Sequence, residues 1–320
     1  MHLLKQLFMA IGVSALLAFS SAGHAAAPLQ KIQAPGYYRM MIGNYELTAL
    51  SDGTVELPME KLLSGIKIEQ LRAILARNYR RPPVETSVNG FLLNTGSKLV
   101  LIDAGAGNLF GPTLGNLVKN LKASGYQPEQ VDEVWLTHMH PDHIGGITTP
   151  DGKMVFPNAI IRADKGEGDY WLSSEKLNTA KPDEKAFFKG AISSLKPYIE
   201  AGKYMPFDGE TELLPGVRSL RAPGHTPGHT LYQIENSDYK LVVCGDLIHV
   251  AAVQFPLPAV TISFDTDPRR AASERQKFIT EAANRGFFLA LAHVQFPGIG
   301  QVKAAGVGFE WVPANYYAIP

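Results

Sequence analysis

Residues 137–146 read Thr-His-Met-His-Pro-Asp-His-Ile-Gly-Gly, which places three histidines and a carboxylate within a few positions of one another. Side chains spaced in this way face one point only if the chain wraps around it, and Pro141 with the glycine pair at 145–146 permits such a turn. Imidazole and carboxylate groups are the usual nitrogen and oxygen ligands of zinc. An exposed polar loop would explain a lone histidine better than this cluster. The segment therefore predicts a metal site.

Further candidate ligands follow along the chain. Residues 222–229 read Ala-Pro-Gly-His-Thr-Pro-Gly-His, a second tight loop that contains His225 and His229. Asp246 follows a predicted strand at residues 241–243, and His293 follows another at 287–292. Loops at strand ends are where rigid scaffolds place reactive groups. Together these segments supply enough ligands for two metal ions: His138, His140, Asp142, His143, His225, Asp246 and His293.

Strand and helix patterns alternate along the rest of the chain, and no linker divides it. Further strands are predicted at residues 38–42, 45–50, 54–57, 87–93, 98–102, 134–136 and 159–163, with turns at Gly43-Asn44 and Asp52-Gly53. Helices are predicted at residues 68–78, 113–123, 183–195 and 269–284. This mixture favours a single α/β domain.

Composition excludes several classes of protein. The chain has 320 residues, of which 45% are hydrophobic and 19% charged, so it is not intrinsically disordered. A formal net charge of zero argues against a general nucleic-acid binder. The single cysteine, Cys244, excludes a disulfide framework and a multi-cysteine zinc finger, and its apolar surroundings in the sequence predict a buried side chain.

The N-terminus has the order of a secretory signal. Lys5 precedes an apolar run at residues 7–19, and small residues follow. The run is shorter than the roughly 20 residues of a membrane span. We expect residues 1–26 to be a signal peptide and residues 27–320 to form the mature domain, periplasmic or secreted and without membrane association after processing. A buried N-terminal helix is the alternative.

The motifs His138-x-His140-x-Asp142-His143, the Gly-His-Thr-Pro-Gly loop around His225, Asp246 and His293 resemble those of dinuclear hydrolases with the metallo-β-lactamase fold. A closer resemblance, to methyl parathion hydrolase and its lactonase-like relatives, is carried by residues 35–40, 109–115, 251–255 and 296–300. The resemblance implies an α/β fold, an αβ/βα sandwich of one domain with metals at one edge between two sheets. It also implies a homodimer.

The resemblance also assigns ligands. One metal would be held by His138, His140 and His225 and the other by Asp142, His143 and His293, with Asp246 and a water or hydroxide bridging them. Two divalent ions are thus expected, and imidazole-rich ligation favours Zn²⁺, with cobalt, iron and manganese left open. Iron-binding flavodiiron relatives usually have Glu at the position of His140. Asp103 is expected to orient a ligand imidazole or else to cap a turn. His229 is expected to orient or support the site without binding metal.

Two ions in this arrangement generate a bridging hydroxide, the expected nucleophile, and polarise a carbonyl or phosphoryl oxygen. Asp142 and Asp246 are the predicted catalytic residues, Asp142 as a ligand that could also relay a proton. A serine esterase is disfavoured because Gly-x-Ser-x-Gly is absent. The substrate is a small ester, lactone or phosphotriester, and no nucleic-acid partner is expected.

Six residues form the predicted substrate pocket. Three align with aromatic residues at the entrance of methyl parathion hydrolase, although core packing would also explain each of them: Phe110, Trp171 and Phe187. The organophosphate-hydrolysing members have an aliphatic residue in place of His249, and Ile262 and Phe264 look bulkier than their pocket walls. Such crowding favours a planar lactone or aryl ester over a tetrahedral phosphotriester. Phosphotriester hydrolysis is the alternative main activity, or a weak side reaction.

Three further functions stay open. A glyoxalase-II-like thioesterase would use the same metals, but basic residues for its carboxylate substrate are not clustered near the C-terminus, where Lys303 stands alone. A β-lactamase fits the motif and the export signal, yet a bridging Asp246 is unlike those enzymes. A non-catalytic metal-binding protein would usually have lost ligands.

Overall fold

The computed structural model describes residues 27–182, 184–316 and 318–319. The predicted signal peptide, residues 1–26, lies outside the described residues. Residues Pro35–Pro320 form one compact unit, as the prediction of a single domain requires. Among the described helices, none has the length and apolar character needed to span a membrane.

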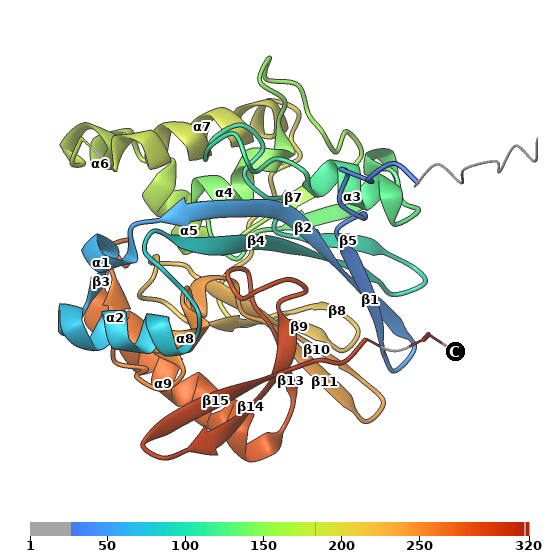
Figure 1. The fold of residues 1–320 in the computed structure, drawn as a ribbon. Coiled ribbons are helices and arrows are strands. Elements are labelled where there is room, and N and C mark those ends of the chain that lie inside the picture. Colours follow the sequence, from blue (N-terminus) through green and yellow to red (C-terminus); the bar gives the residue numbers. More distant parts are fainter. Residues whose placement is uncertain (1–26, 183, 317, 320) are drawn as a thin grey trace, which may run out of the picture. The chain divides into compact units, whose positions relative to one another are not determined.

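Two mixed sheets contain most of the strands (Figure 1). In spatial order the first sheet consists of β1 (Tyr37–Ile42), β2 (Tyr45–Leu57), β4 (Val84–Asn94), β5 (Leu99–Ile102), β6 (Glu133–Trp135) and β7 (Ile160–Arg162). The second sheet consists of β15 (Gly308–Pro313), β14 (Ile299–Ala305), β13 (Phe288–Ala290), β11 (Tyr239–Val243), β10 (Thr230–Asn236), β9 (Val217–Arg221) and β8 (Glu212–Leu214). A small pair is formed by β12 (Thr261–Ile262) and β3 (Leu63–Ser64). Strands β5, β6 and β7 run parallel, as do β11 and β13, and the other pairs are antiparallel.

Alternation along the strands explains why the two sheets stack. Val100 and Ile102 of β5 face the core between the sheets, whereas Leu101 faces the other side of the first sheet. In the second sheet Val243 faces the same central core and Val242 faces outward. Successive side chains of a strand point to opposite faces, so strands that are apolar throughout must be covered on both sides.

Helices provide the outer covers. The described helices are α1 (Met59–Leu62), α2 (Ile68–Arg77), α3 (Leu117–Ala123), α4 (Pro141–Ile144), α5 (Lys165–Trp171), α6 (Ser174–Thr179), α7 (Lys185–Glu200), α8 (Ala251–Gln254) and α9 (Pro268–Arg285). Leu121 of α3 and Leu195 of α7 pack in the outer core of the first sheet, and Ile279 of α9 packs in that of the second. Figure 1 shows α3 and α7 on the outer side of the first sheet and α9 on that of the second. The predicted αβ/βα sandwich is therefore confirmed.

The predicted turn at Asp52-Gly53 is wrong. Strand β2 runs through these residues, because the segments before and after them both pair with β4, with a bulge between Ser51 and Gly53. Gly53 has φ +131°, which suits glycine at such an irregular position. The buried Asp52 carboxylate accepts hydrogen bonds of 2.9–3.0 Å from the backbone N–H groups of Ala106, Gly115 and Leu117, so it anchors a distant loop.

Two helix boundaries also differ from the prediction. The helix expected from residue 113 begins at Leu117, because Gly115 has φ +88° and cannot be helical there. The helix expected to end at residue 195 continues to Glu200, because the buried Tyr198 extends its apolar side past Pro197. Several elements were not predicted, among them α5, α6, β8, β9, β10, β14 and β15.

Candidate metal centre

The seven predicted ligands lie together, although they come from four separate segments of the chain. His138 and His140 follow β6, and the short helix α4 presents Asp142 and His143. The other three follow strands of the second sheet: His225 after β9, Asp246 after β11 and His293 after β13. Their ligand atoms form groups within 4.8 Å of one another. Because β6, β11 and β13 end at one edge of the sandwich, residues distant in sequence meet there.

The Asp246 carboxylate lies at the centre, and its two oxygens face different histidines. Oδ2 is 3.1 Å from His225 Nε2 and 3.6 Å from His138 Nε2. Oδ1 is 3.0 Å from both His143 Nε2 and His293 Nε2. This geometry is that of a carboxylate able to bridge two cations.

The separations within each group suit tetrahedral zinc. His140 Nδ1 is 3.0 Å from His225 Nε2, and Asp142 Oδ2 is 3.5 Å from His293 Nε2 and 3.7 Å from His143 Nε2. Nitrogen and oxygen ligands about 2.0–2.1 Å from a tetrahedral zinc ion lie about 3.3 Å from one another. The side chains are therefore spaced as they would be around two ions.

Several of the candidate ligand atoms have no hydrogen-bond partner among the described residues. His138 Nε2, His143 Nε2 and Asp246 Oδ1 are buried and have no hydrogen-bond partner within the part of the chain that the structure describes. Burial keeps the pKa of His138 well below its usual value, so the ring is neutral and has a free lone pair. At His143 burial also lowers the pKa, but Asp246 and Asp103 raise it well above the usual value. Their charge favours a cation beside this ring, whether a proton or a metal.

The other nitrogens of these rings are held by neighbouring groups. His143 Nδ1 donates to Asp103 Oδ2 (2.8 Å), and His225 Nδ1 donates to Asp265 Oδ1 (2.9 Å). His293 Nδ1 donates to the carbonyl oxygen of Ser87 (2.9 Å). Such partners fix the tautomer and direct Nε2 toward the metal. Asp265 was missed in the sequence because nothing distinguishes it from Asp267 nearby, which caps α9.

His229 does not present a nitrogen to a metal. Its Nδ1 donates to the carbonyl oxygen of Ala222, and its Nε2 accepts the N–H of Asp246, both at 3.1 Å. The ring is neutral, because burial lowers its pKa to about 3. At Gly245, where φ is +47°, a Cβ would lie 2.8 Å from this Nε2, so only glycine fits. His229 therefore supports the Asp246 loop through both of its ring nitrogens.

His249 reaches the centre as well. Its Nε2 lies 3.1 Å from Asp246 Oδ2, and its ring stacks on that of His293 at a centroid distance of 5.2 Å. Neither ring nitrogen has a hydrogen-bond partner among the described residues. Burial lowers the pKa of His249 to about 4, so the imidazole is neutral at pH 7.

Two adjoining cavities open at the ligands. The inner one is only about 20 Å³ and is lined by Phe110, Phe187, His249 and Phe264 together with four of the candidate ligands. The outer one, about 570 Å³, shares three of these aromatic rings and adds Trp171. The rings of Trp171 and Phe187 lie 5.1 and 5.0 Å from that of His140.

The sixth predicted pocket residue lies elsewhere. Ile262 lines neither cavity, and its side chain packs with Met59, Leu63 and other apolar residues of a separate core cluster. Its backbone N–H donates to Asp265 Oδ2 at 3.1 Å. Ile262 can therefore influence the site through Asp265 but does not form the cavity wall, because strand β12 turns its side chain toward β3 and α2.

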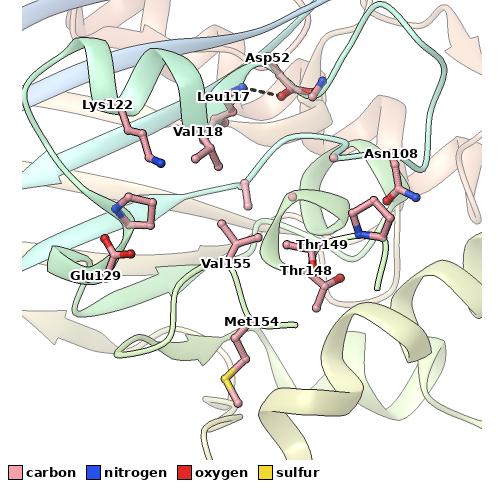
Figure 2. A pocket seen from close by; sticks show the side chains of 16 residues that line it. Asp52, Asn108, Leu117, Val118, Lys122, Glu129, Thr148, Thr149, Met154 and Val155 are labelled. Atoms are coloured by element: carbon pink, nitrogen blue, oxygen red, sulfur yellow. Dashed lines mark hydrogen bonds between the residues drawn. The ribbon is translucent and has the colours of Figure 1, made fainter. Parts of the chain in front are cut away.

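A further cavity of about 540 Å³ lies between α3 and the segment around residues 146–155. Figure 2 shows Lys122 and Glu129 on one side of it and Asn108 and Thr149 on the other. None of the seven candidate ligands lines this cavity. Its size exceeds that of the inner cavity at the ligands, but it lacks comparable chemistry.

Comparisons with known proteins agree with this geometry. The model of the metallo-beta-lactamase superfamily matches residues 83–293. The solved structure of the hydrolase AbOPH of the beta lactamase superfamily is 35% identical, with a TM-score of 0.85 over 90% of this chain and 100% of that chain. AidC, a dizinc quorum-quenching lactonase solved with a product, N-hexanoyl-L-homoserine, is 31% identical, with a TM-score of 0.82 over 88% of this chain and 99% of that chain.

Curated relatives match over shorter stretches. An N-acyl homoserine lactonase of Bacillus sp is 31% identical over 119 residues, which is 37% of this chain and 39% of that protein. The probable metallo-hydrolase YflN of Bacillus subtilis is 30% identical over 157 residues, 47% of this chain and 55% of that protein. The aligned stretch thus spans about half or less of the length of these relatives.

Proposed function

The chain belongs to the metallo-beta-lactamase superfamily, and from this we propose that it is a dinuclear metal hydrolase that opens lactones or cleaves aryl esters. The observation that supports this most strongly is the Asp246 carboxylate, whose oxygens face two separate groups of buried ligands. A cavity lined by aromatic rings adjoins these ligands and offers a place for an apolar substrate.

The residues present fit two divalent ions. His138, His140 and His225 would hold one ion, Asp142, His143 and His293 the other, and Asp246 both. When bound, such ions lower the pKa of water and polarise a carbonyl oxygen. We propose zinc, because the donors are mostly imidazole and because AidC is a dizinc enzyme. Metal analysis of the purified protein separates zinc from cobalt, iron and manganese.

The chain's own side chains would bind the substrate and move protons. Phe110, Phe187 and Phe264 enclose the inner cavity and keep bulk water away from the reacting carbonyl. The neutral His249 has one N–H that can donate to an oxygen as it gains negative charge. The Asp142 side chain is 12% exposed, more than the other ligands, and can pass a proton to the leaving oxygen.

The size of the inner cavity favours a lactone. A planar carbonyl group can approach the ligands through a space of about 20 Å³ more easily than a tetrahedral phosphorus with three further substituents. His249 and Phe264 form two of the walls that narrow this space. The lactonases among the relatives support the same substrate class.

Phosphotriester hydrolysis of the methyl parathion hydrolase type is the second candidate. The aromatic rings of Trp171 and Phe187 beside His140 favour it, because they would suit a flat aromatic leaving group. This candidate requires the inner cavity to widen when the substrate binds.

One measurement separates the two candidates. The mature protein is loaded with zinc, and kcat/KM is measured for an aromatic lactone and for methyl parathion; each tenfold in their ratio corresponds to about 1.4 kcal/mol. We expect the lactone to be favoured, and a ratio favouring methyl parathion would overturn this order. Thioester and β-lactam substrates complete the panel. Two bound ions without hydrolysis of any of these would indicate a non-catalytic metal-binding protein.

We also propose that the protein is exported after removal of residues 1–26 and that it acts as a homodimer. Both proposals rest on the sequence. N-terminal sequencing of the mature protein and light scattering during gel filtration test them directly. An intact N-terminus recovered from the periplasm would contradict the first, and a monomeric mass would contradict the second.

A further inference from the structure

We propose that Glu167 is a positioning residue that holds the two histidine loops at the separation required by one metal ion, an inference that rests on the proposed dinuclear site. The first histidine loop comprises residues 136–140 and the second comprises residues 222–229. Glu167 is not among the candidate ligands, and no motif in the sequence marks it. It lies in α5, between β7 and α6 in the chain.

The carboxylate of Glu167 connects the two loops. It is fully buried, and each of its oxygens accepts one backbone hydrogen bond. Oε2 accepts the N–H of Met139 at 3.0 Å, and Oε1 accepts the N–H of Gly228 at 2.8 Å. Met139 stands between two candidate ligands in the first loop, and Gly228 follows a third in the second loop. The distance between the loops is therefore fixed by the width of one carboxylate.

The second loop packs closely on the start of α5. A Cβ at Gly228 would lie 2.5 Å from the backbone nitrogen of Glu167 and 3.0 Å from its Cγ, so a larger residue would push the loop away. Within the described part of the chain, one backbone-to-backbone hydrogen bond also connects the two loop regions. In this bond the N–H of Thr230 donates to the carbonyl oxygen of Thr137 at 2.9 Å. That bond lies at the base of the loops, and Glu167 bridges them nearer the ligands.

Burying an ionised carboxylate at this position is energetically unfavourable. Burial raises the pKa of Glu167 to about 7, despite the hydrogen bonds that favour the ionised form. A neutral side chain would be easier to bury, but only a carboxylate accepts from two N–H groups with both of its ends. The geometry of the two bonds thus accounts for the residue type.

Glu167 acts on one of the two proposed ion sites. His138, His140 and His225 belong to the two bridged loops. Asp142 and His143 lie on α4 and His293 follows β13, outside both loops. Loosening the bridge should therefore weaken the three-imidazole site and leave the carboxylate-containing site largely unchanged. A general loss of stability would not produce such a difference.

Glu167→Gln is the test variant, because glutamine keeps the size but turns an N–H group toward one of the two donors. Glu133→Gln is the matched control. Glu133 is also buried, but its carboxylate accepts from the side chains of Trp135 (Nε1, 2.8 Å) and Arg162 (Nε, 2.6 Å) and not from a backbone N–H group of either loop. The purified protein is stripped of metal and titrated with Zn²⁺ against a chromophoric chelator, and with Co²⁺, whose visible spectrum distinguishes the two donor sets. Thermal unfolding of each metal-free variant is measured in parallel.

Wild-type protein should bind two ions; fewer than two would refute the proposed function itself. With two bound, we expect Glu167→Gln to weaken the three-imidazole site by about 10–100-fold, the usual effect of removing a group that supports a ligand. The other site, and both sites of Glu133→Gln, should stay within about threefold. Unchanged affinities in Glu167→Gln, or equal losses at both sites, would overturn the inference. Gly228→Ala, which pushes the second loop from α5, should reproduce the selective loss and replaces Glu167→Gln if that variant does not fold.

Discussion

The bond between Asp103 and His143 leads to a quantitative prediction. Asp103 Oδ2 accepts from His143 Nδ1 and from the Thr137 hydroxyl, and Oδ1 accepts the N–H of Thr137, all at 2.8 Å. In Asp103→Asn the amide oxygen can still accept from the Thr137 N–H, which places the amide nitrogen against His143 Nδ1. That nitrogen is a donor, so His143 must shift its proton to Nε2 to accept from it. A protonated Nε2 has no lone pair for a metal.

The expected loss follows from this change of tautomer. Groups that fix a ligand histidine contribute about 10–100-fold to metal affinity, which corresponds to about 1.4–2.7 kcal/mol. The substitution adds no backbone strain, because Asp103 has φ +59° and asparagine tolerates this conformation at least as well. The site of Asp142, His143 and His293 should lose affinity, and the site of His138, His140 and His225 should lose less.

Zinc titration of Asp103→Asn against a chelator measures this loss of affinity. At saturating zinc, the variant should recover part of the wild-type kcat/KM. Asp52→Asn is the control, because the Asp52 carboxylate is also buried but accepts only from the backbone N–H groups of a structural loop. It should lower the melting temperature without changing zinc affinity. Wild-type affinity in Asp103→Asn, or an equal loss in Asp52→Asn, would refute the reasoning.

Three further predictions concern the inner cavity at His249, the buried side chain of Arg275 and the reactivity of Cys244. Replacing His249 with Leu should raise phosphotriester turnover relative to lactone turnover by widening the inner cavity, and an unchanged ratio of kcat/KM values would contradict the crowding argument. Arg275→Met should lower the free energy of unfolding in urea by about 3 kcal/mol or more, because it leaves the buried carbonyl oxygens of Leu247 and Pro258 without a donor and removes one of the two donors to the carbonyl oxygen of Val260. The exposed Arg285→Ala should change the free energy of unfolding by less than about 0.5 kcal/mol, and equal effects of the two substitutions would refute this. Cys244 should not react with Ellman's reagent until the protein unfolds, because its thiol is fully buried and burial raises its pKa; rapid reaction of the native protein would show otherwise.

The candidate site could be predicted well where its residues are close in sequence or follow a strand. The cluster at residues 138–143 wraps around one point through local backbone geometry alone, and His225, Asp246 and His293 belong to recognisable loops at strand ends. Asp103 was found for the same reason, since it directly follows β5. Asp265 and Glu167 were missed because their roles depend on which loop lies opposite them, and no local pattern marks that.

The types and order of the candidate metal ligands, the α/β class and the burial of Cys244 can all be predicted from the amino-acid sequence, because apolar periodicity and short-range spacing are local properties. Three features could not be predicted in this way: the bulge at Asp52-Gly53 within β2, the packing of Ile262 in a separate core, and the division of the Asp246 oxygens between two groups of histidines. These features arise from pairing between strands and contacts between loops far apart in the chain. Their energies depend on distances that are set only when both sheets are packed against each other.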